Sequence, residues 1–271
     1  MKLKTIVDLY LNSSIHVGIA VSSFTAITYI HLGIPVNTEL VVFCFFSTIF
    51  AYNSIKYLDL IVQCKSSLSK NLKTILVISC VALFGMAYFI QIFGWIEIGF
   101  LASLSIVSYL YSHTPVSRFK SLRSVTGIKI VIIAIVWTGT TVILPALSEN
   151  LISDSRVWGE TFQRFLLVII LTLPFDLRDL RVDYGEIKTI PQLIGIKQTK
   201  FASGVLCFLI IASEMLVFSY KTFFSSIALA VITVLLFLIT AKLNLFQSKY
   251  LSSFWVEGIP IAWFIILTLW V

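Results

Sequence analysis

Long apolar runs alternate with short polar segments along the whole chain. The runs fall at about residues 14–32, 38–60, 72–93, 95–112, 125–147, 160–175, 201–219, 222–241 and 254–271. Each lies close to the roughly 20 residues that a helix needs to cross a bilayer core. They are apolar on all sides, whereas the strands of a membrane barrel alternate apolar and polar residues. The pattern predicts an all-α, polytopic membrane helix bundle of about nine transmembrane helices.

Composition fits a membrane protein. Hydrophobic residues make up 58% of the chain, charged residues only 12%, and the mean hydropathy is +0.99. A soluble domain carries roughly twice that share of charge. No repeat or linker divides the chain, so we expect a single transmembrane domain over residues 1–271. The net charge of +7 comes largely from short loops, so it indicates membrane topology and no nucleic-acid partner.

The distribution of Lys and Arg predicts the orientation. With the N-terminus in the cytoplasm, the inner loops hold most of the basic residues, whereas the outer segments hold only Arg156, Arg164 and Lys221. Cytoplasmic loops of membrane proteins carry such an excess of positive charge. We therefore expect a multi-pass protein of the inner (plasma) membrane with a cytoplasmic N-terminus and an outer C-terminus.

The densest polar stretch, residues 174–191, begins where the sixth apolar run ends. Asp176, Asp179 and Asp183 are spaced i, i+3 and i+7, so a helix would bring them to one face. Three carboxylates on one face repel one another unless a cation lies between them. Carboxylates together with phosphate oxygens suit Mg²⁺. The spacing thus predicts a Mg²⁺–diphosphate site, with Lys188 available to pair with phosphate.

A second interpretation of the same stretch requires no ligand. The acids would then lie in a solvated loop and pair with Arg178 and Arg181. The spacing alone leaves both interpretations open.

The string from Asp176 to Pro191 resembles the second Asp-rich motif of the UbiA superfamily of intramembrane prenyltransferases. Tyr111–Pro115, ahead of the basic Arg118, resembles the segment after that family's fourth helix. The family joins a polyprenyl diphosphate to an acceptor, often an aromatic ring. Its Asp motifs hold Mg²⁺ on the diphosphate, and ionisation gives an allylic carbocation that the acceptor attacks.

The resemblance implies roles for particular residues. The catalytic and metal-binding residues would be Asp176, Asp179 and Asp183. Lys129 is a charge within the fifth apolar run, which either snorkels to the interface or lines the diphosphate pocket. The expected diphosphate-binding residues are Lys188, Lys129, Arg118, Arg123, Lys56, Asn53 and Tyr111.

The first Asp-rich motif of the family is altered in this chain. The corresponding segment, residues 53–61, keeps Asn53 but has Ser54, Tyr57 and Ile61 where the family has Asp. Lys56 adds a positive charge that could touch phosphate directly in place of one Mg²⁺. The expected cofactor is Mg²⁺ held mainly by the second motif.

Three functions fit these observations. The first is an integral-membrane prenyltransferase that transfers a prenyl group from a polyprenyl diphosphate to an aromatic or other acceptor by Mg²⁺-assisted ionisation. The second, favoured by the altered first motif, is a non-catalytic UbiA-like protein that binds a lipid or quinone. The third is a small-molecule transporter, which Glu214 in the middle of an apolar run would allow.

Overall fold

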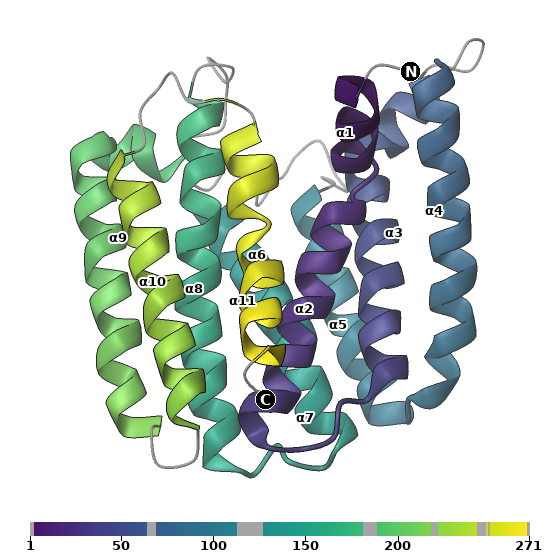
Figure 1. The fold of residues 1–271 in the computed structure, drawn as a ribbon. Helices are drawn as coiled ribbons and strands as arrows, with labels where there is room; N and C mark the ends of the chain where they lie inside the picture. The colour runs from purple at the N-terminus through teal and green to yellow at the C-terminus, as the bar shows by residue number, and fades with distance from the viewer. Residues whose placement is uncertain are drawn as a thin grey trace.

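A computed structural model describes residues 3–63, 69–112, 127–180, 189–217, 222–242, 248 and 250–269. All regular structure in these ranges is helical, which confirms the predicted all-α class (Figure 1). The helices are α1 (Leu3–Asn12), α2 (Ile15–Leu32), α3 (Thr38–Gln63), α4 (Lys70–Phe89), η1 (Ile90–Ile92), α5 (Trp95–Ser112), α6 (Ile128–Thr138), η3 (Gly139–Ile143), α7 (Leu144–Ser148), α8 (Ser155–Asp179), α9 (Ile190–Val217), α10 (Phe223–Lys242), η4 (Leu251–Val256) and α11 (Ile259–Thr268).

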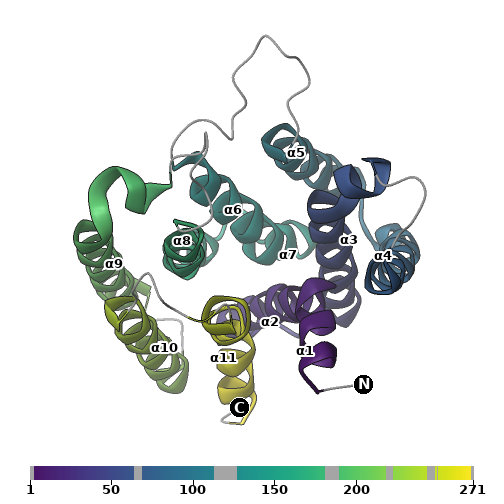
Figure 2. The ribbon, with the colours of Figure 1, turned by 90° about the horizontal axis from the view of Figure 1, so that it is seen from above.

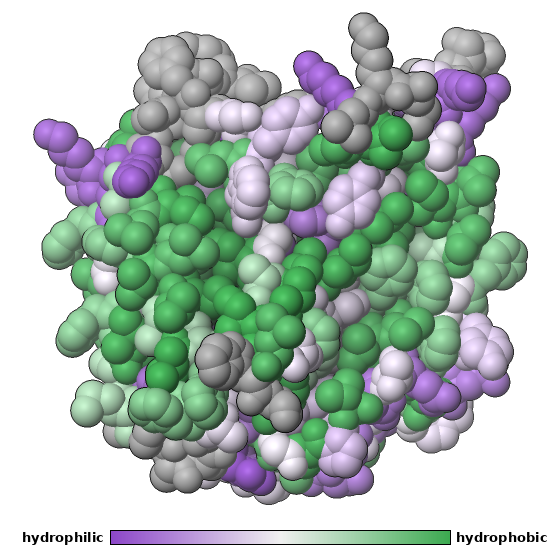
Figure 3. Space-filling model, in the orientation of Figure 1, coloured by the Kyte–Doolittle hydropathy of each residue, from purple (hydrophilic) through white to green (hydrophobic). Residues whose placement is uncertain are grey.

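Seven helical segments of the described chain are long and apolar enough to cross a membrane. They include three composite rods: α4 with η1, α6 with η3 and α7, and η4 with α11. The predicted number of nine stays a prediction, because α5 is shorter and α8 carries several charged residues. Figure 3 shows a broad hydrophobic band between two hydrophilic ends, as a bilayer requires.

The first apolar run is preceded by a separate short helix. Ser14 adopts a left-handed conformation with φ of 60°, which interrupts the helix between α1 and α2. The polar residues Asn12, Ser13 and Ser14 mark this break in the sequence. As a result α1 lies at the upper end of the bundle in Figure 1, beside the start of η4 and α11.

The helices form a ring around a central region. Helix α2 packs against α3 and α11, and α8 packs against α6 and α9. Seen from above, α1, α3, α6, α8 and α11 surround the same region (Figure 2). Helix α9 bends sharply at Gly195, where φ is 82°, a conformation that favours glycine.

A buried arginine joins four parts of this ring. The guanidinium of Arg164 in α8 donates a hydrogen bond to the Phe24 carbonyl oxygen of α2 (2.8 Å) and contacts the hydroxyl oxygen of Thr141 in η3 (3.2 Å). The guanidinium also lies 3.9 Å from the carboxylate of Glu160. That carboxylate in turn lies 2.9 Å from Nδ1 of His31. The ring of Trp263 in α11 lies on the other side. Charge inside an apolar bundle is costly unless it is paired and hydrogen-bonded, so this network fixes how the helices pack.

We expect Arg164→Leu to destabilise the fold strongly. The change would leave Glu160 buried without its cation, and breaking a buried pair in this way costs about 3–5 kcal/mol. Thermal unfolding of the detergent-solubilised protein would show a marked drop in Tm. Arg156→Gln is the matched control, because Arg156 pairs with Asp154 at a partly exposed site and such pairs stabilise little. Equal Tm changes in the two variants would contradict this role of Arg164.

Candidate diphosphate site

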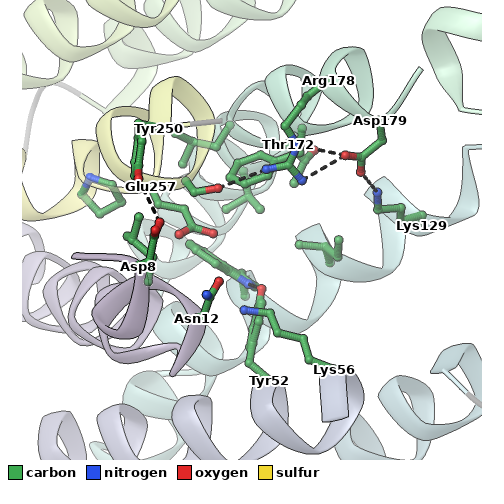
Figure 4. Close-up of a pocket in the computed structure, with 18 residues that line it drawn as sticks. Asp8, Asn12, Tyr52, Lys56, Lys129, Thr172, Arg178, Asp179, Tyr250 and Glu257 are labelled. Atoms are coloured by element: carbon green, nitrogen blue, oxygen red, sulfur yellow. Dashed lines mark hydrogen bonds and ion pairs between the residues drawn. The ribbon is translucent and has the colours of Figure 1, made fainter. Parts of the chain in front are cut away.

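A cavity of about 370 Å³ opens at the upper end of the bundle (Figure 4). Its wall is built by α1, α3, α6, α8, η4 and α11. Charged and polar side chains line the mouth, and apolar ones line the deeper part. The lining residues are Asp8, Leu11, Asn12, Tyr52, Lys56, Lys129, Ile133, Trp137, Val168, Leu171, Thr172, Phe175, Arg178, Asp179, Tyr250, Ser253, Glu257 and Pro260. This division of polar from apolar surface suits an amphipathic ligand with a charged head.

Helix α8 carries the first two acids of the second motif. It continues past Pro174 as far as Asp179, so Asp176 and Asp179 lie one turn apart. The Asp176 carboxylate is buried and accepts a hydrogen bond from Lys129 Nζ at 3.0 Å. Asp179 lines the cavity, 3.5 Å from the same nitrogen. Lys129 therefore points into the site and is paired there, rather than snorkelling away from it.

Arg178 is a third charge at the mouth. Its guanidinium pairs with the Asp179 carboxylate at 2.9 Å and donates hydrogen bonds to the hydroxyls of Ser253 (3.0 Å) and Ser252 (3.3 Å). The ligand-free interpretation predicts this pairing of Arg178 with an acid. The same guanidinium lines the cavity, so the pair also places a cation where a ligand would bind.

The altered first motif presents Lys56 to the cavity. Lys56 Nζ donates to the Ser14 hydroxyl at 3.0 Å and lies over the ring of Tyr52. The neighbouring Asn53 does not line the cavity. Its amide donates instead to the Ser13 carbonyl oxygen (3.1 Å) and the Ser79 hydroxyl (2.9 Å), which joins α3 to the α1–α2 turn and to α4.

The other predicted site residues are distributed as follows. Tyr111 lies in the last turn of α5 and is not among the residues that line the cavity. Four predicted residues lie outside the described ranges: Asp183, Lys188, Arg118 and Arg123.

Several lining residues gave no signal in the sequence. Asp8 and Asn12 precede the first apolar run, and Tyr250 and Glu257 flank the start of the last run. The Tyr250 hydroxyl donates to the Asp8 carboxylate at 2.9 Å, so α1 meets the residue that precedes η4 at one side of the cavity. An isolated acid at the end of an apolar run is usually an interface residue, and only the Asp8–Tyr250 contact in the folded structure reveals this wall.

Two aromatic residues line the cavity below its charged mouth. Trp137 lies eight residues after Lys129 on α6, about 12 Å farther from the mouth at 1.5 Å per residue. Its indole Nε1 donates to the Tyr52 hydroxyl at 2.8 Å. The Phe24 ring packs edge-on against the indole from the core side. We call this hydrogen-bonded pair, which lies beneath the charged mouth, the Trp137–Tyr52 floor.

Of the expected metal ligands in the described part of the chain, Asp179 lines the cavity, whereas Asp176 is buried against Lys129 and is not among the lining residues. No group of three or more His, Cys, Asp or Glu side chains among the described residues could hold a metal alone. Asp176 and Asp179 nevertheless provide carboxylates one turn apart, and Mg²⁺ commonly uses one or two carboxylates together with water and phosphate oxygens. For both carboxylates to bind the ion, the Lys129 ammonium, now 3.0 Å from Asp176 and 3.5 Å from Asp179, would have to turn from them toward a phosphate.

No family model matches the sequence, and no curated protein matches it either. Among solved structures, the chain is similar to a UbiA homolog from Archaeoglobus fulgidus bound to GPP and Mg²⁺. The TM-score is 0.65 at 13% sequence identity, and the match covers 95% of this chain and 96% of the other. The similarity covers nearly the whole of both chains, so the protein has the fold of this UbiA homolog.

Proposed function

We propose that this protein is a UbiA-type integral-membrane prenyltransferase, which transfers a prenyl group from a polyprenyl diphosphate to an acceptor. The observation that carries the proposal is the cavity itself. Lys56, Lys129 and Arg178 converge on its mouth beside Asp179, and an apolar pocket continues below them. Such a cavity suits a diphosphate head and an isoprenoid tail. The archaeal UbiA homolog of the same fold has GPP and Mg²⁺ bound.

The cations would hold the diphosphate and stabilise the charge that develops on it. Lys56, Lys129 and Arg178 reach the mouth from three different helices, so they can surround a head group. Asp176, Asp179 and Asp183 would hold Mg²⁺, which supplies electrostatic stabilisation of the leaving oxygens when bound. We assign Lys188, Arg118 and Arg123 as further diphosphate ligands from the adjoining segments.

The apolar part of the cavity would protect the reactive prenyl group. Ile133, Val168 and Leu171 line it, and the Trp137–Tyr52 floor ends it. Exclusion of water from such a pocket prevents premature capture of an allylic cation. We further propose that the mouth faces the cytoplasm, because most Lys and Arg residues of the loops belong to that side.

The altered first motif favours one competing function, a lipid- or quinone-binding protein without turnover. Lys129 pairs with Asp176 and lies close to Asp179. These contacts neutralise the acids without a metal ion, so they are also compatible with a protein that only binds its ligand. Release of pyrophosphate from a prenyl diphosphate distinguishes the two functions, because a binding protein releases none.

Asp179→Asn and Asp183→Asn should abolish most of the activity. Each change removes a negative charge from the proposed metal site, and loss of one electrostatic contact to a transition state commonly costs about 100-fold or more in rate. Mg²⁺-dependent pyrophosphate release from geranyl diphosphate by the purified protein measures the effect. Asp154→Asn, at the opposite end of α8, is the control and should retain activity. Full activity of both site variants would refute the assignment.

Lys56→Ala should weaken diphosphate binding both with and without Mg²⁺. A hydrogen bond to a charged group contributes about 1.5–3 kcal/mol, which corresponds to roughly a 10- to 100-fold higher Kd. Isothermal titration with geranyl diphosphate gives the Kd under both conditions. Lys70→Ala, at the exposed start of α4, controls for loss of a positive charge. An unchanged Kd would exclude Lys56 as a phosphate ligand.

The Trp137–Tyr52 floor should limit the length of the prenyl chain. Trp137→Leu shortens the side chain that closes the pocket, so more of a longer tail can be buried. We expect the ratio of kcat/KM for farnesyl over geranyl diphosphate to rise about tenfold. Tyr52→Phe, which removes only the hydroxyl, should change this ratio much less. If Trp137→Leu leaves the ratio unchanged, the tail follows another path.

A further inference from the structure

The cavity contains a carboxylate that the diphosphate site does not use. Glu257 lies between η4 and α11, and its side chain points into the cavity from the wall opposite the Lys129–Asp179 pair (Figure 4). Within the described part of the chain, no side chain donates a hydrogen bond to it. Lys56 and Arg178 are the cations that act on it electrostatically. An acid that faces an internal cavity without a hydrogen-bond donor has the capacity to accept a hydrogen bond from a ligand.

The position of Glu257 along the cavity indicates which part of a ligand it would meet. Ser253, one turn earlier, holds the Arg178 guanidinium at the charged mouth. Pro260, one turn later, belongs to the apolar wall. Glu257 therefore lies at the level where the charged mouth gives way to the apolar pocket. A prenyl diphosphate bound with its diphosphate at the mouth and its tail in the apolar pocket would place its C1–O bond at this same level. This is the bond that breaks in the reaction.

We propose that Glu257 forms an acceptor subsite, where its carboxylate accepts the hydrogen bond of the acceptor's O–H or N–H group and takes up the proton released on transfer. This inference rests on the proposed function. It adds the chemical class of the acceptor, a neutral hydroxyl or amine compound. An acceptor that carries its own carboxylate is disfavoured, because Asp8 lines the same side of the cavity as Glu257.

The reaction balances without any further reagent. The bond between prenyl C1 and the diphosphate oxygen breaks, and the electron pair leaves with the diphosphate between Lys56, Lys129 and Arg178. The acceptor oxygen or nitrogen forms the new bond to C1. Its proton passes to a carboxylate oxygen of Glu257 and from there to water at the open mouth. A positioned general base of this kind typically contributes about 10²- to 10⁴-fold to the rate.

Glu257→Gln separates this role from diphosphate binding, because the amide keeps the shape of the side chain but is a poor proton acceptor. The assay would supply geranyl diphosphate and a panel of neutral acceptors, hydroquinone and aromatic amines, with 1,4-dimethoxybenzene as the matched compound without an O–H. We expect the wild-type protein to prenylate at least one hydroxyl or amine compound and not the dimethyl ether. Glu257→Gln should lower that rate about 100-fold while the Kd for geranyl diphosphate changes less than twofold.

The outcomes distinguish this inference from the function on which it rests. Glu39→Gln, an exposed acid at the start of α3, is the control variant and should react as the wild type does. Unchanged transfer by Glu257→Gln would overturn the role of Glu257. Binding of geranyl diphosphate without transfer to any hydroxyl or amine in the panel would overturn the acceptor class. Failure of the wild-type protein to bind geranyl diphosphate would instead refute the proposed function.

Discussion

The need to pair charge inside an apolar bundle determines how this protein is assembled. Arg164 is fully buried, and its contacts with Glu160, the Phe24 carbonyl oxygen and the Thr141 hydroxyl cannot be replaced by water at that depth. These contacts reach from α8 to α2 and η3. Because the penalty for an unpaired charge exceeds what ordinary apolar packing contributes at any one position, the helices have little freedom to slide or rotate against one another. The positions of these helices also determine the walls of the cavity above the network.

The same constraint acts at the mouth of the cavity, but there it leaves charges available to a ligand. Lys129 donates a hydrogen bond to the buried Asp176 carboxylate and neutralises its charge, and this contact joins α6 to α8. Asp179, one turn farther on, is paired with Arg178 at the cavity surface. Pairs that are only partly enclosed can exchange a protein partner for a phosphate or a metal ion at lower cost than fully buried ones. The bundle thus has fully buried charges that are paired within the protein and partly exposed charges that a ligand can reach.

The altered first motif shows why a linear motif is a limited guide to a site. Asn53 matches the family pattern, yet its side chain turns toward Ser13 and Ser79 and holds α3 against its neighbours. Lys56 departs from the pattern and faces the cavity. On a helix, positions three residues apart differ by about 60° in direction, and the packing of the helix decides which of them meets the cavity. Lys56 brings a positive charge to the wall where the family's first motif has acids. A diphosphate at this site can therefore be held on that side by an ammonium group instead of by a metal ion.

The sequence by itself determined the helical class, the positions of most helices and the acidic segment at the end of α8, because these depend on local periodicity and on the length of apolar runs. It also indicated the fold through the second Asp-rich motif, and it singled out Lys129 and Lys56 as charges in unusual places. Only the tertiary structure decided that Asp8 and Tyr250 meet, that Trp137 and Tyr52 lie together in the cavity wall, and that Glu257 points into the cavity. These contacts join residues between about 85 and 242 positions apart, and no local pattern encodes which faces of distant helices pack together.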